Sequence, residues 1–125
     1  MINNEKKEMR YSILKFSNRH IMNMKTKKDI VEDWLPRYTG RALEDFSKHI
    51  ILTNFDYYLD LFAEKYNAPI IGENKNMPNV SHDGITMINF GMGSANAATI
   101  LDLLSAIEPE AVLFIGKCGG LKAKH

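Results

Sequence analysis

The sequence contains little cysteine and no long apolar run. A single cysteine, Cys118, among 125 residues excludes an internal disulfide and fits a reducing compartment. No apolar stretch approaches the roughly eighteen residues that a membrane-spanning helix needs. The first residues also lack the apolar core of a secretory signal. We therefore expect a cytoplasmic protein without a membrane segment.

The sequence also has no large excess of charge. Lysines and arginines number 16 and aspartates and glutamates 15, which leaves a formal net charge of +1. A chain this close to neutral exerts no general attraction on nucleic acid or on an anionic membrane surface. The four histidines lack the spacing of a metal site. We therefore expect neither a nucleic-acid partner nor a bound metal.

Basic residues are nevertheless concentrated near the amino terminus. Residues 1–28 contain only two acids, Glu5 and Glu8, among many lysines and arginines. A basic arm for nucleic acid, an organelle-targeting segment and a start codon ahead of the true one at Met24 are alternative interpretations. No helical period or interleaved aromatic residues support an arm. The prediction is a disordered extension over residues 1–23, followed by a structured domain over residues 24–125.

From Thr26 onward the pattern alternates between helices and strands. Thr26 and Asp29 form a capping box for a short helix that Pro36 ends. Asn54 is the predicted N-cap of a longer helix. Strands are predicted at residues 49–53, 69–71, 85–90 and 111–115, helices at residues 55–66 and 94–107, and a polar loop at residues 72–83. This order predicts an α/β fold with a doubly wound, mainly parallel sheet.

The predicted strand at residues 111–115 consists of five consecutive apolar residues. Such a run is typical of a parallel strand that is covered on both faces. The preceding helix is apolar nearly all round and also needs cover on more than one side. Without that cover, we expect an exposed apolar face and an unpaired strand edge.

Turns with small or polar residues follow three of the predicted strands. They are Thr53-Asn54, Gly91-Met92-Gly93-Ser94 and residues 116–120. Ligands of open α/β sheets bind beyond the carboxyl ends of the strands, so these turns are expected to form one site. Lys117 supplies a positive charge suited to a phosphate group, whereas Cys118 is expected to be a buried packing residue. The turn at Gly91 lacks the third glycine of a dinucleotide fingerprint, so NAD is not expected.

Four segments together resemble the AMP nucleosidases, a family within the nucleoside phosphorylase superfamily. They are LPRYTG at residues 35–40, ILTNF at residues 51–55, INFGMGSANAATI at residues 88–100 and FIGKCGGL at residues 114–121. The resemblance implies a three-layer doubly wound α/β fold of phosphorylase type and a homo-oligomer, usually a hexamer. It also implies hydrolysis of AMP to adenine and ribose 5-phosphate without a metal or an organic cofactor.

The resemblance further implies which residues bind AMP. Gly91, Met92, Gly93 and Ser94 would contact the ribose and the base, and Thr53, Asn54, Lys117, Cys118 and Gly119 would lie on the ribose and phosphate side. Arg37 is a second candidate phosphate ligand, which would reach the site of a neighbouring subunit. Tyr57 or its neighbour stands where phosphorylases have an arginine, and Lys117 stands where they have a serine. Both departures favour water over phosphate as the attacking group.

The resemblance implies that two catalytic acids lie outside these residues. In the family, a glutamate that holds the ribose hydroxyls and an aspartate that protonates the purine follow the GKCGG turn, beyond residue 125. We therefore expect an amino-terminal half of an enzyme, cut soon after Leu121 and inactive alone. Two alternatives stay open. One is a phosphorylase or nucleosidase of the same superfamily that acts on an unphosphorylated nucleoside, and the other is a non-catalytic nucleotide-binding domain.

Overall fold

The computed structural model describes residues 26–121, so the predicted extension over residues 1–23 lies outside the described residues. The chain divides into two compact units, residues 1–30 and residues 31–125. In the first unit, Thr26 and Asp29 form the predicted capping box at the start of helix α2 (Lys27–Thr39). The Asp29 N–H donates to Thr26 Oγ1 at 3.2 Å, and the Thr26 N–H donates to Asp29 Oδ2 at 3.1 Å. The predicted helix start is therefore confirmed.

Pro36 lies inside α2, so the prediction that it ends the helix was wrong. Proline lacks an N–H and leaves one carbonyl of the preceding turn without its helical partner. The last turn is held by other bonds: Thr39 Oγ1 donates to the Leu35 carbonyl at 2.7 Å, and the Gly40 N–H donates to the Pro36 carbonyl at 2.7 Å. Gly40 then ends the helix with a φ of 71°, which suits glycine.

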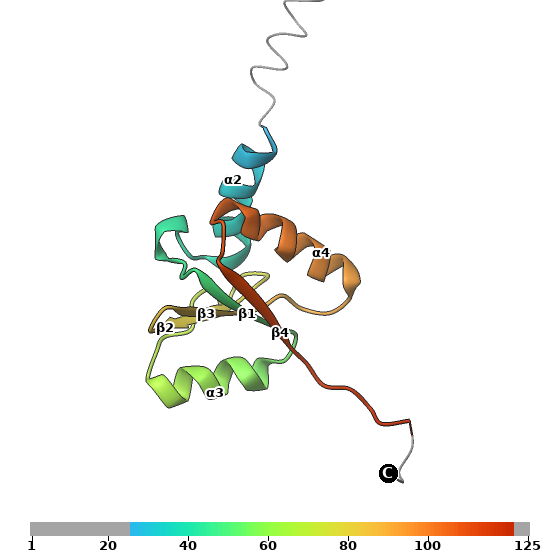
Figure 1. The fold of residues 1–125 in the computed structure, drawn as a ribbon. Coiled ribbons are helices and arrows are strands. Elements are labelled where there is room, and N and C mark those ends of the chain that lie inside the picture. Colours follow the sequence, from blue (N-terminus) through green and yellow to red (C-terminus); the bar gives the residue numbers. More distant parts are fainter. Residues whose placement is uncertain (1–25, 122–125) are drawn as a thin grey trace, which may run out of the picture. The chain divides into compact units, whose positions relative to one another are not determined.

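The second unit is built on a four-stranded sheet in the order β2-β3-β1-β4 (Figure 1). Strands β1 (His49–Thr53), β3 (Ile85–Asn89) and β4 (Ala111–Ile115) are parallel to one another. Strand β2 (Asn79–His82) runs antiparallel to β3. The predicted strands at residues 49–53, 85–90 and 111–115 are thus confirmed, with β3 one residue shorter. The mainly parallel α/β sheet confirms the predicted fold class.

The second predicted strand, at residues 69–71, is not a strand. Ile71 forms only an isolated bridge with Asn79, and the predicted loop at residues 72–83 contains β2. The sequence of β2 is NVSH, with a single apolar side chain, so its strand signal is weak. A buried amide network compensates, because Asn79 Nδ2 donates to the Thr39 carbonyl at 2.7 Å and Asn79 Oδ1 accepts from Arg41 Nε at 2.6 Å.

In that network the Arg41 guanidinium donates to the neutral amide oxygen of Asn79. The guanidinium is half-buried, and desolvation lowers the pKa of Arg41, while the nearby Asp45 carboxylate opposes this shift. The guanidinium also stands 6.0 Å from the centre of the Phe46 ring. These contacts connect the loop after α2 to the edge strand β2, which explains why a polar segment joins the sheet.

Two helices cover opposite faces of the sheet. Figure 1 shows α3 (Asp56–Tyr66) beneath the strands and α4 (Ser94–Leu103) above them. Short 3₁₀ helices lie at Leu43–Asp45, before β1, and at Leu104–Ala106, directly after α4. The predicted helix at residues 94–107 is confirmed to within one residue, although its last turn is 3₁₀.

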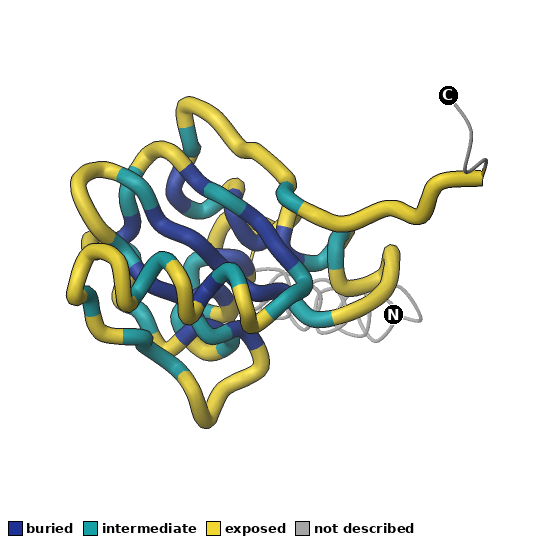
Figure 2. The backbone as a smooth tube through the Cα atoms, turned by 90° about the horizontal axis from the view of Figure 1, so that it is seen from below, coloured by how far each residue is buried: buried dark blue, intermediate teal, exposed yellow. Residues whose placement is uncertain are grey.

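The hydrophobic core consists of one cluster on each face of the sheet. On the α4 face the buried residues are Val31, Leu35, Phe46, Ile50, Leu52, Met77, Ile88, Phe90, Ile100, Leu103, Leu104 and Ile107, and on the α3 face they are Leu59, Val80 and Met87. Figure 2 shows that the buried positions concentrate in the central strands. The smaller cluster leaves the α3 face less well covered.

The predicted N-cap of α3 is wrong. The residue before the helix is Phe55, and no side chain there bonds to a free N–H of the first turn. Asn54 lies one residue too early for this role, because the helix starts at Asp56 rather than at residue 55. Its side chain is therefore available for other contacts.

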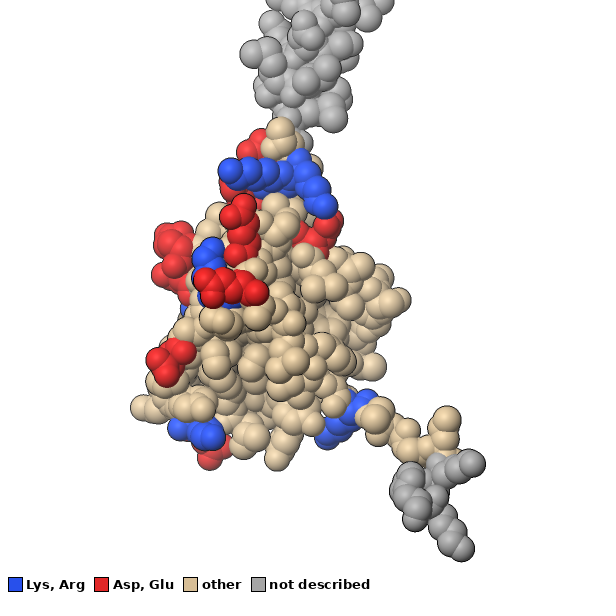
Figure 3. Space-filling view, viewed as in Figure 1, with Lys and Arg blue, Asp and Glu red and all other residues tan. Residues whose placement is uncertain are grey.

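Strand β4 has one sheet neighbour, β1, and its other edge lies at the border of the described sheet. Its apolar residues are exposed, with Leu113 at 59% and Phe114 at 57% of their full accessible surface. Figure 3 shows few charged side chains on the face that carries β4 and α4. The expected exposed apolar face and strand edge are confirmed for the described residues.

We predict that this edge makes the 125-residue chain self-associate and leaves it marginally stable. An unpaired edge and adjacent apolar side chains favour intermolecular strand pairing. Size-exclusion chromatography should detect oligomers or aggregates, and Leu113→Lys should shift the chain toward monomer because a lysine opposes pairing at an edge. A wild-type monomer that unfolds cooperatively at about 45–65 °C would contradict the prediction.

Candidate functional site

The three predicted turns meet at one edge of the sheet. In the parallel register, Thr53 at the end of β1 lies opposite Asn89 at the end of β3 and Ile115 at the end of β4. The turns at residues 53–54, 91–94 and 116–120 therefore leave the sheet at the same level. Parallel pairing of strands far apart in sequence brings these groups together, as predicted from the sequence.

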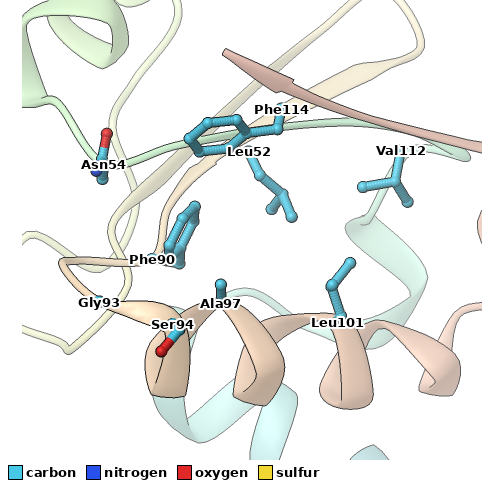
Figure 4. A pocket seen from close by; sticks show the side chains of 9 residues that line it. All are labelled: Leu52, Asn54, Phe90, Gly93, Ser94, Ala97, Leu101, Val112 and Phe114. Carbon is cyan, nitrogen blue, oxygen red and sulfur yellow. The ribbon is translucent and has the colours of Figure 1, made fainter. Parts of the chain in front are cut away.

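A cavity of about 530 Å³ opens beside this edge, on the α4 face of the sheet (Figure 4). Its lining residues are Leu52, Asn54, Phe90, Gly93, Ser94, Ala97, Leu101, Val112 and Phe114. Three of them, Asn54, Gly93 and Ser94, were predicted site residues. The apolar ones were missed, although strand alternation places Val112 and Phe114 on one face of β4. The Phe90 and Phe114 rings lie 5.9 Å apart at this cavity.

The glycine turn after β3 forms one wall of the cavity. Gly91 has a φ of 85° and Gly93 a φ of 95°, which glycine adopts at little cost. Met92 between them is 76% exposed. Ser94 is the first residue of α4, and Gly93 is its N-cap without a capping side chain. The first turn of α4, whose N–H groups have no partner within the helix and where the helix dipole is positive, therefore begins at this end of the cavity.

Thr53 and Asn54 play different parts at the end of β1. Thr53 is fully buried, and its Oγ1 accepts a hydrogen bond from the Phe55 N–H at 3.2 Å, so its hydroxyl shapes the turn. Asn54 lines the cavity. Its Oδ1 is buried and has no hydrogen-bond partner among the residues that the structure describes. A buried acceptor without a partner is costly, so a donor from a ligand would be favoured there.

Lys117 lies over aromatic rings of the α3 start. Its Nζ is 5.1 Å from the ring centre of Phe55, 5.7 Å from that of Tyr57 and 5.8 Å from that of Tyr58. Cation–π attraction of this kind holds an ammonium in place. Because these rings belong to the α3 start and the cavity lies on the α4 face, the ammonium stands beside the sheet edge rather than among the cavity-lining residues.

Cys118 is exposed and free, so the prediction of a buried packing residue was wrong. Gly119 is also exposed, with open space where a Cβ would lie. The extended backbone after β4 has no cover among the described residues, which explains both exposures. The turn that carries Lys117 is thus open to solvent on the described part of the chain.

Arg37 lies on α2 and not at the cavity. Its Nη2 forms an ion pair with Asp33 Oδ2 at 3.2 Å, one helical turn earlier. His49 Nε2 lies 3.6 Å from Glu110 Oε2, and His82 stacks on Tyr66. Within residues 26–121, no three histidine, cysteine or acidic side chains gather as a metal site would require. None of the described helices has the length and hydropathy of a membrane span.

Comparisons with known proteins agree with this geometry. A solved AMP nucleosidase from Bacteroides thetaiotaomicron VPI-5482 is 67% identical to this chain, with a TM-score of 0.76. The match covers 78% of this chain and 42% of the Bacteroides chain. AMP nucleosidases from Escherichia coli K12 and O157:H7 are 27% identical over 70% of this chain. The chain spans 26% of the length of these curated relatives.

A more distant solved structure shares the fold alone. The uridine phosphorylase from Vibrio fischeri ES114 is 20% identical over 62% of this chain, with a TM-score of 0.52. No family model matches the sequence. By sequence and by fold, this chain is therefore similar to the AMP nucleosidases, and it shares the α/β fold of the uridine phosphorylase.

Proposed function

We propose that this chain forms part of an enzyme that hydrolyses the N-glycosidic bond of AMP and releases adenine and ribose 5-phosphate. Such an enzyme serves purine nucleotide salvage or breakdown. The observation that carries the proposal is the 67% identity to a solved AMP nucleosidase over 78% of the chain. No observation favours a phosphorylase, because the uridine phosphorylase likeness extends only to the fold.

The cavity is proposed as the site of the adenine and part of the ribose. Its volume of about 530 Å³ suits a nucleotide base with its sugar, since ligand pockets range from roughly 300 to 1,000 Å³. The exposed ring of Phe114 offers an aromatic face against which a purine can stack, and the buried ring of Phe90 lies beside it. Met92 is an additional apolar contact for the base.

Polar groups at the rim are proposed to hold the sugar phosphate. Asn54 Oδ1 is a free buried acceptor for a ribose hydroxyl. The N–H groups at the start of α4, beginning with Ser94, are suited to an anionic or hydroxyl oxygen. Lys117 supplies the positive charge for the 5′-phosphate, and the adjoining Cys118 and Gly119 supply backbone N–H groups. Thr53 shapes the turn after β1, and Arg37 is proposed to reach the site of a neighbouring subunit.

The chemistry requires a proton donor for the departing base. Cleavage of an N-glycosidic bond builds positive charge on the sugar carbon and negative charge on the base, so a general acid speeds the step. The nine cavity-lining residues include no carboxylic acid and no histidine. We propose that the general acid and the ribose-binding acid belong to a longer enzyme, of which residues 24–125 are the amino-terminal half.

The attacking group and the cellular setting follow from the same residues. The resemblance implies that Lys117 and an aromatic residue, Tyr57 or its neighbour, replace a serine and an arginine of the phosphorylases. Both replacements favour water as the nucleophile, and we propose that the reaction needs no cofactor. The free, exposed thiol of Cys118 suits a reducing cytoplasm. A homo-oligomer, hexameric as in the family, would cover the apolar face of β4 and α4 in part.

Lys117→Ala is expected to weaken the preference for AMP over adenosine. The protein for this test is a chimera in which this chain replaces the matching part of the Bacteroides enzyme. A charge-assisted contact to phosphate contributes about 1.5–3 kcal/mol, and the preference in kcat/KM should fall accordingly. Lys65→Ala is the matched control, because Lys65 Nζ also lies over an aromatic ring, 5.4 Å from the centre of Tyr66, at the other end of α3. An unchanged preference for AMP over adenosine would show that Lys117 does not contact the phosphate and is an ordinary solvated lysine.

A further inference from the structure

The Asn89 side chain joins two parts of the site edge. Asn89 is the last residue of β3 and is only 8% exposed. Its Nδ2 donates to Asp56 Oδ1 at 2.6 Å, and its Oδ1 accepts from the Gly91 N–H at 3.0 Å. One amide thus connects the end of β3, the first residue of α3 and the first residue of the glycine turn.

A second asparagine, Asn96 of α4, lies close to the glycine turn. A Cβ on Gly91 would lie 3.0 Å from Asn96 Nδ2 of α4, so the backbone of Gly91 packs closely against that amide. With a φ of 85°, Gly91 has few intrinsic restraints of its own. Contacts with the side chains of Asn89 and Asn96 therefore restrict the turn more than the intrinsic preference of Gly91 does.

We propose that Asn89 is a positioning residue that fixes the glycine turn at residues 91–93 in the geometry that binds AMP. This inference rests on the proposed function, because the turn is the wall of the AMP site. Asparagine is suited to the position because it accepts from Gly91 and donates to Asp56 at once. An aspartate could still accept from Gly91, but it would place a second carboxylate against Asp56.

The donor and the acceptor of the hydrogen bond between Asn89 and Asp56 can be exchanged by a double substitution. In Asn89→Asp combined with Asp56→Asn, the new carboxylate at position 89 would accept from the Gly91 N–H and from the new amide at position 56. The double variant therefore restores both bonds that Asn89→Asp disturbs. Asp56→Asn alone should be nearly neutral, because the Asn89 amide can donate to an amide oxygen.

Hydrogen–deuterium exchange of the full 125-residue chain, followed by mass spectrometry with and without AMP, tests the proposal. In Asn89→Asp we expect the peptide covering residues 90–94 to exchange about tenfold faster or more, since repulsion between the new carboxylate and Asp56 displaces the side chain that accepts from the Gly91 N–H. In the same variant, AMP should no longer slow the exchange of that peptide. The double variant should return both readouts to within about threefold of wild type.

Asn79→Asp is the matched control, because Asn79 is also a buried strand asparagine with a side-chain network of its own. It should accelerate exchange near residues 39–41 and 71–79 and leave residues 90–94 unchanged. The proposal is overturned if Asn89→Asp leaves the turn and its AMP response unchanged, or if the double variant fails to restore them. If wild type shows no AMP-dependent protection, the proposal that this chain binds AMP is wrong. The exchange rate of residues 90–94 in Asn89→Asp then still shows whether Asn89 orders the glycine turn.

Discussion

The 125-residue chain alone is expected to release no measurable adenine from AMP. The cavity-lining residues carry no acid that could protonate the departing base. General acid catalysis contributes typically about 10²–10⁴-fold to such a step, and a missing ribose-binding acid would add to the deficit. Incubation of purified chain with AMP, followed by chromatographic separation of adenine, measures the result.

The solved Bacteroides relative, assayed in parallel, controls for substrate and conditions. A blank without protein gives the background hydrolysis of AMP. Adenine that accumulates with time above this blank, in proportion to the concentration of the chain, would disprove the proposal that the catalytic acids lie elsewhere. It would mean that a group within these 125 residues performs the proton transfer.

Gly72→Ala is expected to destabilise the fold strongly. Gly72 has a φ of 72°, and a Cβ there would lie 2.1 Å from the Thr39 carbonyl oxygen and 2.9 Å from its carbon. Thr39 is fully buried, so its backbone cannot move away easily. We expect a loss of about 2–4 kcal/mol in the free energy of unfolding. The thermal midpoint should fall by at least about 10 °C.

Gly84→Ala is the matched control for backbone strain. Gly84 has a φ of 80°, but nothing lies within 4 Å of the position that a Cβ would take. In this variant the free energy of unfolding should fall only by the cost of placing an alanine in a left-handed conformation, about 1–2 kcal/mol. Circular dichroism at low protein concentration measures both midpoints. Equal losses of stability in the two variants would show that the close approach of Gly72 to Thr39 adds nothing to the cost of the substitution.

Much of the fold could be predicted because its signals are local. The apolar runs at residues 49–53 and 111–115 contain enough β-branched and large apolar residues to define β1 and β4 to the residue. Thr26 and Asp29 are close in sequence, so their capping box could be recognised directly. Two of the failures have different causes, one local and one distant in sequence. Pro36 is tolerated because of bonds made by the residues after it, and β2 forms because Asn79 is held by Thr39 and Arg41.

The site was predictable in outline but not in detail. The turns at residues 53–54, 91–94 and 116–120 could be grouped because parallel strands end at the same edge. The cavity walls could not, because Leu52, Phe90 and Leu101 come from three different segments and carry no motif. The rings that surround Lys117 lie about sixty residues before it in the sequence, and only the fold brings them together. Asn89 was missed because a polar residue at a strand end has many possible roles.

The most direct test of the proposed function is adenine release by the chimera that joins this chain to the remainder of the Bacteroides AMP nucleosidase. We predict a folded chimera that hydrolyses AMP and prefers AMP to adenosine, because this chain supplies its half of the AMP site. Cooperative unfolding at a temperature similar to that of the parent enzyme establishes that the chimera is folded. A folded chimera that releases no adenine from AMP, or that prefers adenosine, would contradict the proposed function.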